Sequence, residues 1–463
     1  MNSVTNETQA TGHPRRWLAL VVLSLALTMV VIDNTILAVA IPSIGKALHA
    51  DETALQWITT SYSLVLAGLL LPLAVMSDRR GRKTLLIVGL AIFGVASTAA
   101  AFATTPAMLV CARGAMGVGG ACAMPASLSV LNSVFAPADR GQALAIWSGV
   151  AGFASGAGPI VGGLLLARFW WGSVFLVNAP VAIVALVAAV AWVPQSSDPA
   201  SPMVDRRSAV RWWGALTAVI VAVIEGPRQG WLSPVVIVAT AAAAGLFVAF
   251  TRNERRSPGP LIERAAARDP RMRWGAASIS ALFFGAFGSQ FVLTQWIQFS
   301  QRRSALEAGL LFVPNALATV VAALGNPRLV ARFGHGRIVA TGLGVLGAGG
   351  VLSAIAVVAG SLPAVAAGGL LIGAGIGTAS ASCVELIMSS ASPERAGSAA
   401  GVNETLIEAA GATGIAVLGS VLAATGSYAW PLPVMAVVAF VTAVGATRAL
   451  RGANSSINPA TTA

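Results

Sequence analysis

The sequence predicts an all-α protein that crosses a membrane many times, and its composition and the length of its apolar runs carry that prediction. Of the 463 residues, 56% are hydrophobic and only 10% are charged, and the mean hydropathy is +0.79. A soluble domain has about a quarter of its residues charged, so this composition excludes that class, and its apolar content excludes disorder. Because a membrane helix needs about 20 apolar residues, we divide the chain into spans.

Fourteen apolar runs are long enough to cross a membrane. The first run is too long for the core of a signal peptide, so we expect it to be retained. An even number of spans predicts that both termini lie on one side. To within a few residues at each end, the expected spans are 17–41, 54–76, 84–103, 107–135, 142–166, 172–193, 209–226, 233–250, 274–298, 306–330, 338–358, 362–390, 397–424 and 430–449.

The distribution of basic residues predicts that both termini are cytoplasmic. The formal net charge is +12, from 29 Lys and Arg against 17 Asp and Glu. With the N-terminus inside, 23 of the 29 basic residues fall in inner segments, as expected of cytoplasmic loops. Topology therefore explains the positive charge, and no basic patch remains for nucleic acid. We expect a multi-pass protein of the cell membrane, that is, the inner or plasma membrane.

Two long polar segments divide the chain into two halves. They bracket the seventh and eighth spans, and removing that pair leaves six spans on each side, a common arrangement in transporters with repeated halves. The expected parts are a cytoplasmic tail over 1–16, a six-helix bundle over 17–195, a two-helix insert over 196–250, a cytoplasmic linker over 251–273, a second six-helix bundle over 274–450 and a cytoplasmic tail over 451–463.

Cysteine and histidine give no pattern for covalent or metal chemistry. The three cysteines lie in apolar runs and the three histidines are scattered, so neither a metal cluster nor a catalytic triad can be built. The glycine-rich stretch 373–377 lies in an apolar span and lacks the Gly-Lys-Ser/Thr of a nucleotide loop. We therefore expect no enzyme activity, no metal and no cofactor.

Charged side chains inside the spans need an explanation, because each costs at least about 2.5 kcal/mol near the bilayer centre. Asp33 and Arg113 are both expected roughly 10 to 12 Å from the outer surface, so they can meet. Their pair is either a structural lock between two helices or a proton-controlled switch. The residues of this kind are Asp33, Arg113, Glu225, Glu385, Glu404 and Glu408.

The thirteenth span places two of these acids on one helix face. Glu404 and Glu408 are one turn apart and share that face with Gly401 and Gly411. The small residues allow another helix to approach, so the acids are expected to face the bundle and to exchange protons. The alternative is a pair of hydrogen-bonded polar residues with access to water at the cytoplasmic end.

Other polar or aromatic residues in the spans are candidates to line a substrate cavity. Trp147 and Trp296 lie deep enough to stack on a flat or cationic ligand, although packing is the plainer role. Glu385 is either functional or solvated, and Glu225 is expected at the interface. The cavity candidates are Asp33, Asn34, Trp147, Gln290, Trp296, Asn315, Glu385, Asn403 and Glu404.

Five segments resemble motifs of the major facilitator superfamily, over roughly residues 15 to 450. With fourteen spans, the chain is most similar to its drug:proton antiporter subgroup, the multidrug and antibiotic efflux transporters. It departs from the usual motifs at Ala74, Met116 and Ile407, and it has Thr60 and Thr319 where some members carry acids. The segments are Val31-Ile-Asp-Asn-Thr-Ile-Leu-Ala-Val-Ala-Ile-Pro42, Asp78-Arg-Arg-Gly-Arg-Lys83, Arg113-Gly-Ala-Met-Gly-Val-Gly-Gly120, Gly158-Pro-Ile-Val-Gly-Gly163 and Gly401-Val-Asn-Glu-Thr-Leu-Ile-Glu-Ala-Ala-Gly411.

The resemblance implies a major facilitator fold of two six-helix bundles plus a two-helix insert, working by alternating access. It implies export of small lipophilic cations or neutral drugs in exchange for protons, by a monomer in the lipid bilayer. The implied roles are proton coupling for Asp33, Arg113, Glu404 and Glu408, gating for Asp78, Arg79, Gly81, Arg82 and Lys83, and an antiporter motif at Gly158, Pro159, Gly162 and Gly163.

Three other functions fit the same spans. A dedicated exporter of a single metabolite or self-made antibiotic keeps the fold and narrows the substrate range. A proton-coupled nutrient importer is disfavoured by the segment at 158–163, which resembles antiporters. A membrane scaffold would transport nothing.

Overall fold

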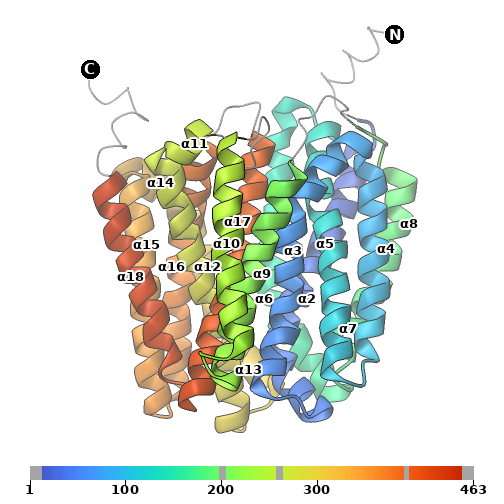
Figure 1. The fold of residues 1–463 in the computed structure, drawn as a ribbon. Coiled ribbons are helices and arrows are strands. Elements are labelled where there is room, and N and C mark those ends of the chain that lie inside the picture. Colours follow the sequence, from blue (N-terminus) through green and yellow to red (C-terminus); the bar gives the residue numbers. More distant parts are fainter. Residues whose placement is uncertain (1–12, 198–204, 257–263, 391–395, 451–463) are drawn as a thin grey trace, which may run out of the picture.

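Long helices run side by side through the whole molecule, and α2 begins and α18 ends at the same end of the bundle (Figure 1). This computed structural model describes residues 13–197, 205–256, 264–390 and 396–450. The predicted tails therefore lie largely outside the described residues.

The helices follow the expected spans closely. Polar residues in the short loops begin several of them, as where Asp51 accepts a hydrogen bond from the backbone N–H of Ala54 at the start of α3. The first half comprises α2 (Arg16–Leu48), α3 (Glu52–Arg80), α4 (Arg82–Ala101), α5 (Pro106–Val134), α6 (Pro137–Arg168), α7 (Ser173–Leu176) and α8 (Asn178–Trp192).

The rest of the chain continues with α9 and α10, the predicted insert, and then the second half. The helices are α9 (Arg206–Gln229), α10 (Pro234–Arg256), α11 (Arg264–Arg268), α12 (Pro270–Gln295), the π-helical η1 (Trp296–Ser300), α13 (Ala305–Leu311), α14 (Val313–Phe333), α15 (His335–Val358), α16 (Leu362–Met388), α17 (Ala396–Thr425) and α18 (Pro431–Leu450).

Two expected spans contain an interruption. The span predicted at 172–193 breaks between α7 and α8, and the one at 306–330 breaks between α13 and α14. In each case a proline, Pro180 or Pro314, follows the break by two or three residues. Proline has no N–H to donate to the preceding turn, so the helical hydrogen-bond ladder is cut there.

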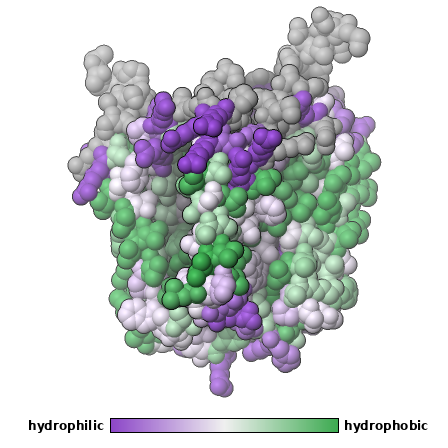
Figure 2. All heavy atoms as spheres, viewed as in Figure 1, coloured by the Kyte–Doolittle hydropathy of each residue, from purple (hydrophilic) through white to green (hydrophobic). Residues whose placement is uncertain are grey.

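Within the described residues, twelve helical segments are long and apolar enough to cross a membrane. The 29-residue α3 and the 32-residue α6 run among them, and α6 contributes a shorter apolar stretch, Gly156–Arg168. Hydrophobic residues cover the flanks of the bundle, and hydrophilic residues gather at its ends (Figure 2). The chain is therefore a multi-pass membrane protein.

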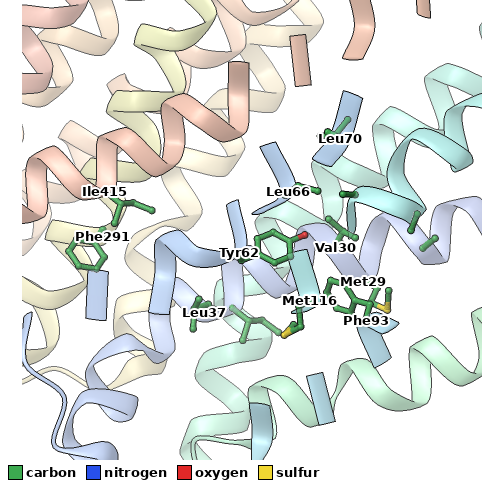
Figure 3. Packing of buried hydrophobic residues seen from close by; sticks show 14 of the residues in the cluster. Met29, Val30, Leu37, Tyr62, Leu66, Leu70, Phe93, Met116, Phe291 and Ile415 are labelled. Atoms are coloured by element: carbon green, nitrogen blue, oxygen red, sulfur yellow. The ribbon is translucent and has the colours of Figure 1, made fainter. Parts of the chain in front are cut away.

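The two halves meet along a few helices only. The helices α2 to α8 pack against one another, as do α12 to α18. The halves join where α3 packs on α17, where α6 packs on α13 and α14, and where α2 packs on α12 and α13. Helix α9 lies over the first of these seams, against both α3 and α17, and α10 packs on α9. In the interior of the first half, Met29, Tyr62, Phe93 and Met116 point toward one another from four helices (Figure 3).

Close backbone contact ties the halves together at the seam between α6 and α13. A Cβ on Gly163 would lie only 2.6 Å from the Cα of Leu306, and one on Gly309 only 2.4 Å from the carbonyl oxygen of Pro159. Nearby, Gln298 donates a 2.8 Å hydrogen bond to the carbonyl of Val39 on α2. This seam therefore tolerates no side chain at either glycine.

We predict that Gly163→Val destabilises the protein by about 1–3 kcal/mol, because the new side chain must push α13 away from α6. Thermal unfolding in detergent measures the effect. Gly149→Val is the matched control on the same helix, since a Cβ there would meet nothing within 4 Å. Equal melting temperatures for the two variants would contradict this close approach.

Candidate functional site

A buried ion pair joins α2 to α5 in the interior of the first half. The guanidinium of Arg113 donates to Oδ2 of Asp33, and the two side chains are 0% and 1% exposed. The structure therefore contains the contact between Asp33 and Arg113 that their depth in the membrane predicts. Both residues belong to helices of the first bundle, and α2 also packs on α12 and α13 of the second half.

The other oxygen of Asp33 is also occupied. Asn178 of α8 donates through Nδ2 to Oδ1 of Asp33 over 2.9 Å, and the same amide lies 3.1 Å from Oγ of Ser97 on α4. Ser97 in turn donates to the carbonyl of Phe175 over 2.9 Å. The carboxylate is thus held from two sides, by a charge and by an amide, and four helices meet around it.

On its other side, Arg113 faces α3. Its Nε donates to the carbonyl of Ile58 over 3.4 Å, and its guanidinium carbon lies 4.5 Å from the ring centroid of Tyr62, a cation–π contact. Within the described residues, Nη2 of Arg113 and the hydroxyl of Tyr62 have no hydrogen-bond partner. The arginine therefore keeps a donor that Asp33 does not use.

Glu408 approaches the same part of α3 from α17, in the second half. It is 7% exposed, Ser63 is within hydrogen-bonding reach of it, and it feels the positive charge of Arg113. Its Oε2 has no partner among the described residues. Tyr62 lies in the neighbourhood of Glu408, Asp33 and Arg113. Two neighbouring residues of α3 therefore contact the two groups: Tyr62 lies beside Arg113 of the ion pair, and Ser63 lies beside Glu408.

Glu404 lies one turn earlier on α17 and is half-buried. Its Oε1 lies 3.5 Å from Nδ2 of the adjacent Asn403, and Oδ1 of Asn403 is buried with no described partner. Unpaired polar atoms of Asn403 and Glu408 therefore gather on one stretch of α17. This is the arrangement expected of a surface that meets a ligand or water.

The remaining cavity candidates are dispersed rather than gathered around Asp33. Asn315 donates to the carbonyl of Gly369, which ties α14 to α16 over 3.0 Å, and Trp296 is 2% exposed inside η1. Glu385 is exposed and lies near His335 at the start of α15. The half-buried candidates are Asn34, Trp147 and Gln290.

The motif at 78–83 contacts the end of α8 in its own half. Gly81 turns the chain from α3 to α4 with a φ of 126°, in the region that favours glycine. Nζ of Lys83 donates to the carbonyl of Val190 over 2.8 Å. The backbone N–H of Arg82 donates to the carbonyl of Ser196 over 3.0 Å. Arg79 is half-buried, and the side chain of Asp78 lies outside the described set.

The motif at 158–163 packs between two helices. A Cβ on Gly158 would lie 1.9 Å from Oγ1 of Thr35 on α2, and one on Gly162 would lie 3.3 Å from Ile36. On the other face, Gly163 and Pro159 meet α13, as described above. The segment therefore lets α6 contact α2 and the second half at once.

Sequence reasoning missed three members of the site: Ser97, Asn178 and Tyr62. It explained the buried charges by one another and named other uncharged residues as cavity candidates, but it did not ask which uncharged side chains bond the buried pair. A polar side chain within an apolar run could have indicated them, because a buried charge needs hydrogen bonds from neighbouring polar groups.

The comparisons with known proteins decide the family. The sequence pattern of the Major Facilitator Superfamily matches residues 23–415 and 304–461. The chain belongs to this superfamily. It is 33% identical to the multidrug efflux pump LfrA of Mycolicibacterium smegmatis, over 89% of this chain and 81% of the relative.

A second relative supports the family, and a solved structure supports the fold. The chain is 32% identical to the tetracenomycin C resistance and export protein of Streptomyces glaucescens, over 90% of this chain and 78% of the relative. A solved POT family transporter, bound to 5-aminolevulinic acid, shares the fold with a TM-score of 0.69 at 15% identity, over 92% of this chain and 94% of its own. The family and its relatives indicate a transporter rather than an enzyme.

We predict that Arg113→Gln destabilises this superfamily member by about 3–5 kcal/mol, because it leaves the carboxylate of Asp33 buried without its charge partner. The double variant Asp33→Asn with Arg113→Gln should be less destabilised than Arg113→Gln alone. Thermal unfolding in detergent tests this cycle.

Arg271→Gln is the control for the loss of an arginine from an ion pair. Its pair with Asp269 spans 2.9 Å, but the side chains are 28% and 21% exposed, so the expected cost is only about 0–1 kcal/mol. Additive effects of Asp33→Asn and Arg113→Gln would show that the two side chains do not depend on each other.

Proposed function

We propose that the chain is a proton-coupled antiporter that exports small lipophilic drugs, cationic or neutral, by alternating access. The observation that carries this proposal is the buried pair of Asp33 and Arg113 next to a second, unpaired buried acid, Glu408. Buried acids in a membrane are expensive and are typical of proton relays. The names of the relatives, a multidrug efflux pump and a tetracenomycin C resistance and export protein, support export as the direction.

In this mechanism Asp33 is the proton-sensing group and Glu408 meets the cation. When Asp33 is ionised, Arg113 is held in the first half and the carboxylate of Glu408 is free to attract a positively charged substrate. Protonation of Asp33 removes its attraction for Arg113, and the unpaired Nη2 donor then favours Glu408. The arginine would thereby compete with the bound cation and help to release it.

Tyr62 and Ser63 have the positions that such an exchange needs. The ring of Tyr62 lies under the guanidinium, and Ser63 is within reach of Glu408. Helix α3 packs on both α5 and α17. A shift of Arg113 across α3 would therefore change the contact between α3 and α17, where the two halves meet. Protonation in one half can therefore bias the contact between both halves.

We also propose fourteen spans, the twelve described segments together with α3 and α6, which places the chain in the drug:proton antiporter subgroup. Both termini then face the cytoplasm and the membrane is the cell membrane, as the basic residues predict. We also propose the domain division expected from the sequence, two six-helix bundles with a two-helix insert, the insert being α9 and α10.

A dedicated exporter of one antibiotic is the second candidate. The relative from Streptomyces glaucescens is named for resistance to a single compound, tetracenomycin C, and its export. A panel of chemically unrelated drugs distinguishes the two. Resistance to several classes supports the broad exporter, whereas resistance to one class supports the dedicated one.

We predict that an imposed pH gradient drives ethidium accumulation in everted vesicles that contain the wild-type chain, and that Asp33→Asn reduces it at least about tenfold. The amide mimics the protonated acid and so removes the proton-dependent exchange. Glu225→Gln is the control, because the described partners of this acid are Trp57, Gln229 and Arg228, and neither Asp33 nor Arg113 is among them. Unchanged accumulation in Asp33→Asn would refute the role of Asp33.

We predict a different defect for Glu408→Gln, which should weaken ethidium binding about tenfold, equivalent to ~1.4 kcal/mol, and leave export of a neutral drug largely intact. The variant loses the attraction for a cation but retains the pair of Asp33 and Arg113. Equilibrium binding and vesicle transport measure the two properties separately. Equal loss for cationic and neutral drugs would contradict the assignment of Glu408 to the cation.

A further inference from the structure

The insert contains a basic groove that plays no part in the site described above. It is a depression of about 610 Å³ between α9 and α10, at the end of the bundle where α2 begins. Three arginines line it, Arg211 from α9 and Arg252 and Arg256 from the last turns of α10. Its walls below them are apolar and small, and include Gly245 and Val248.

The arginines of the groove have capacity to bind an anion. Arg211 makes one long hydrogen bond, from Nη1 to the carbonyl of Ala249 over 3.4 Å. Arg252 and Arg256 are exposed, and neither forms an ion pair with any residue that the structure describes. No acid is among the described lining residues. Asp205, which caps α9, instead accepts hydrogen bonds from Asn253 and from the backbone of Arg207.

The level of the groove in the bundle favours a lipid over a soluble anion. Trp212, beside Arg211, packs on Phe250 with ring centroids 5.7 Å apart, as aromatic residues do at the headgroup level. Below, α10 has exposed apolar side chains such as Ile237, Val238 and Phe247. In Figure 2 hydrophilic side chains lie directly above apolar surface on this face. A ligand that fills the groove therefore needs both an anionic head and hydrocarbon tails.

The packing of α10 gives such a ligand a structural role. This helix packs mainly on α9, and its buried residues in the described structure are Val236 and Ala239, near the opposite end. At the arginine-bearing end, α10 is held to α9 by the hydrogen bond from Asn253 to Asp205 and by the packing of Trp212 on Phe250. A lipid whose phosphate bridges Arg211 and Arg252 would add a further link between α9 and α10 at that end.

We propose that this groove binds the phosphodiester headgroup of an anionic phospholipid of the inner leaflet, with the acyl chains along α10. Basic pockets between membrane helices on the cytoplasmic side bind such headgroups through arginine. The proposal concerns the insert alone and does not depend on drug transport or on proton coupling.

The test is native mass spectrometry of the detergent-purified full chain with phosphatidylglycerol, and with phosphatidylethanolamine of the same acyl chains as the zwitterionic comparison. We expect phosphatidylglycerol to bind more tightly, and Arg211→Gln and Arg252→Gln each to weaken it about fivefold. Arg211→Lys should restore much of the binding. Arg255→Gln is the matched control, because Arg255 is an exposed arginine on the same helix end that does not line the groove.

A second arm separates a lipid site from a free-anion site. Inorganic phosphate or glycerol 3-phosphate, at millimolar concentration, should leave the bound phosphatidylglycerol in place, because neither has acyl chains. Displacement by these anions would overturn the proposal, as would equal binding of the two lipids or an equal loss in Arg255→Gln. Thermal unfolding of each variant without lipid checks that it is folded.

Discussion

An ionised carboxylate in the interior of a membrane protein is stable only while a charge and further hydrogen bonds surround it. Asp33 meets this requirement through Arg113 on one oxygen and Asn178 on the other. Four helices of the first half, α2, α4, α5 and α8, are thereby joined around one group. A change in the charge of Asp33 weakens the interactions that hold these helices together. The pair is therefore suited to a switch and costly to break.

In the proposed mechanism, the position of this pair separates proton sensing from ligand contact. Asp33 is enclosed in the first half, whereas Glu408 and Asn403 present unpaired atoms on α17, in the second half. Helix α3 contacts both groups, with Tyr62 beside Arg113 and Ser63 within reach of Glu408. The seam at Gly163 and Gly309 then joins the halves elsewhere through backbone contact. Coupling would pass through α3, the helix that also supports α9 of the insert.

Hydropathy predicted the helices well because each span must satisfy its own backbone hydrogen bonds in lipid. The breaks at Pro180 and Pro314 were harder to predict, since proline is tolerated in many membrane helices, as at Pro42 within α2. The pair of Asp33 and Arg113 followed from equal depth and opposite charge. The sequence did not predict the contributions of Asn178, Ser97 and Tyr62, because depth alone does not show which uncharged side chains point inward. Whether Asp33 faces its own half or the second half likewise depends on the rotation of α2 about its axis. The near-uniform apolar sequence of α2 leaves that rotation undefined.

Proton release on ligand binding to the purified protein measures the central claim most directly. If substrate binds when Asp33 is ionised, adding ethidium to the weakly buffered wild-type protein should release up to about one proton per bound ligand, since binding and protonation are reciprocally linked. The same titration of Asp33→Asn should release none. Equal proton release from wild type and Asp33→Asn would place the exchanging proton elsewhere and contradict the account.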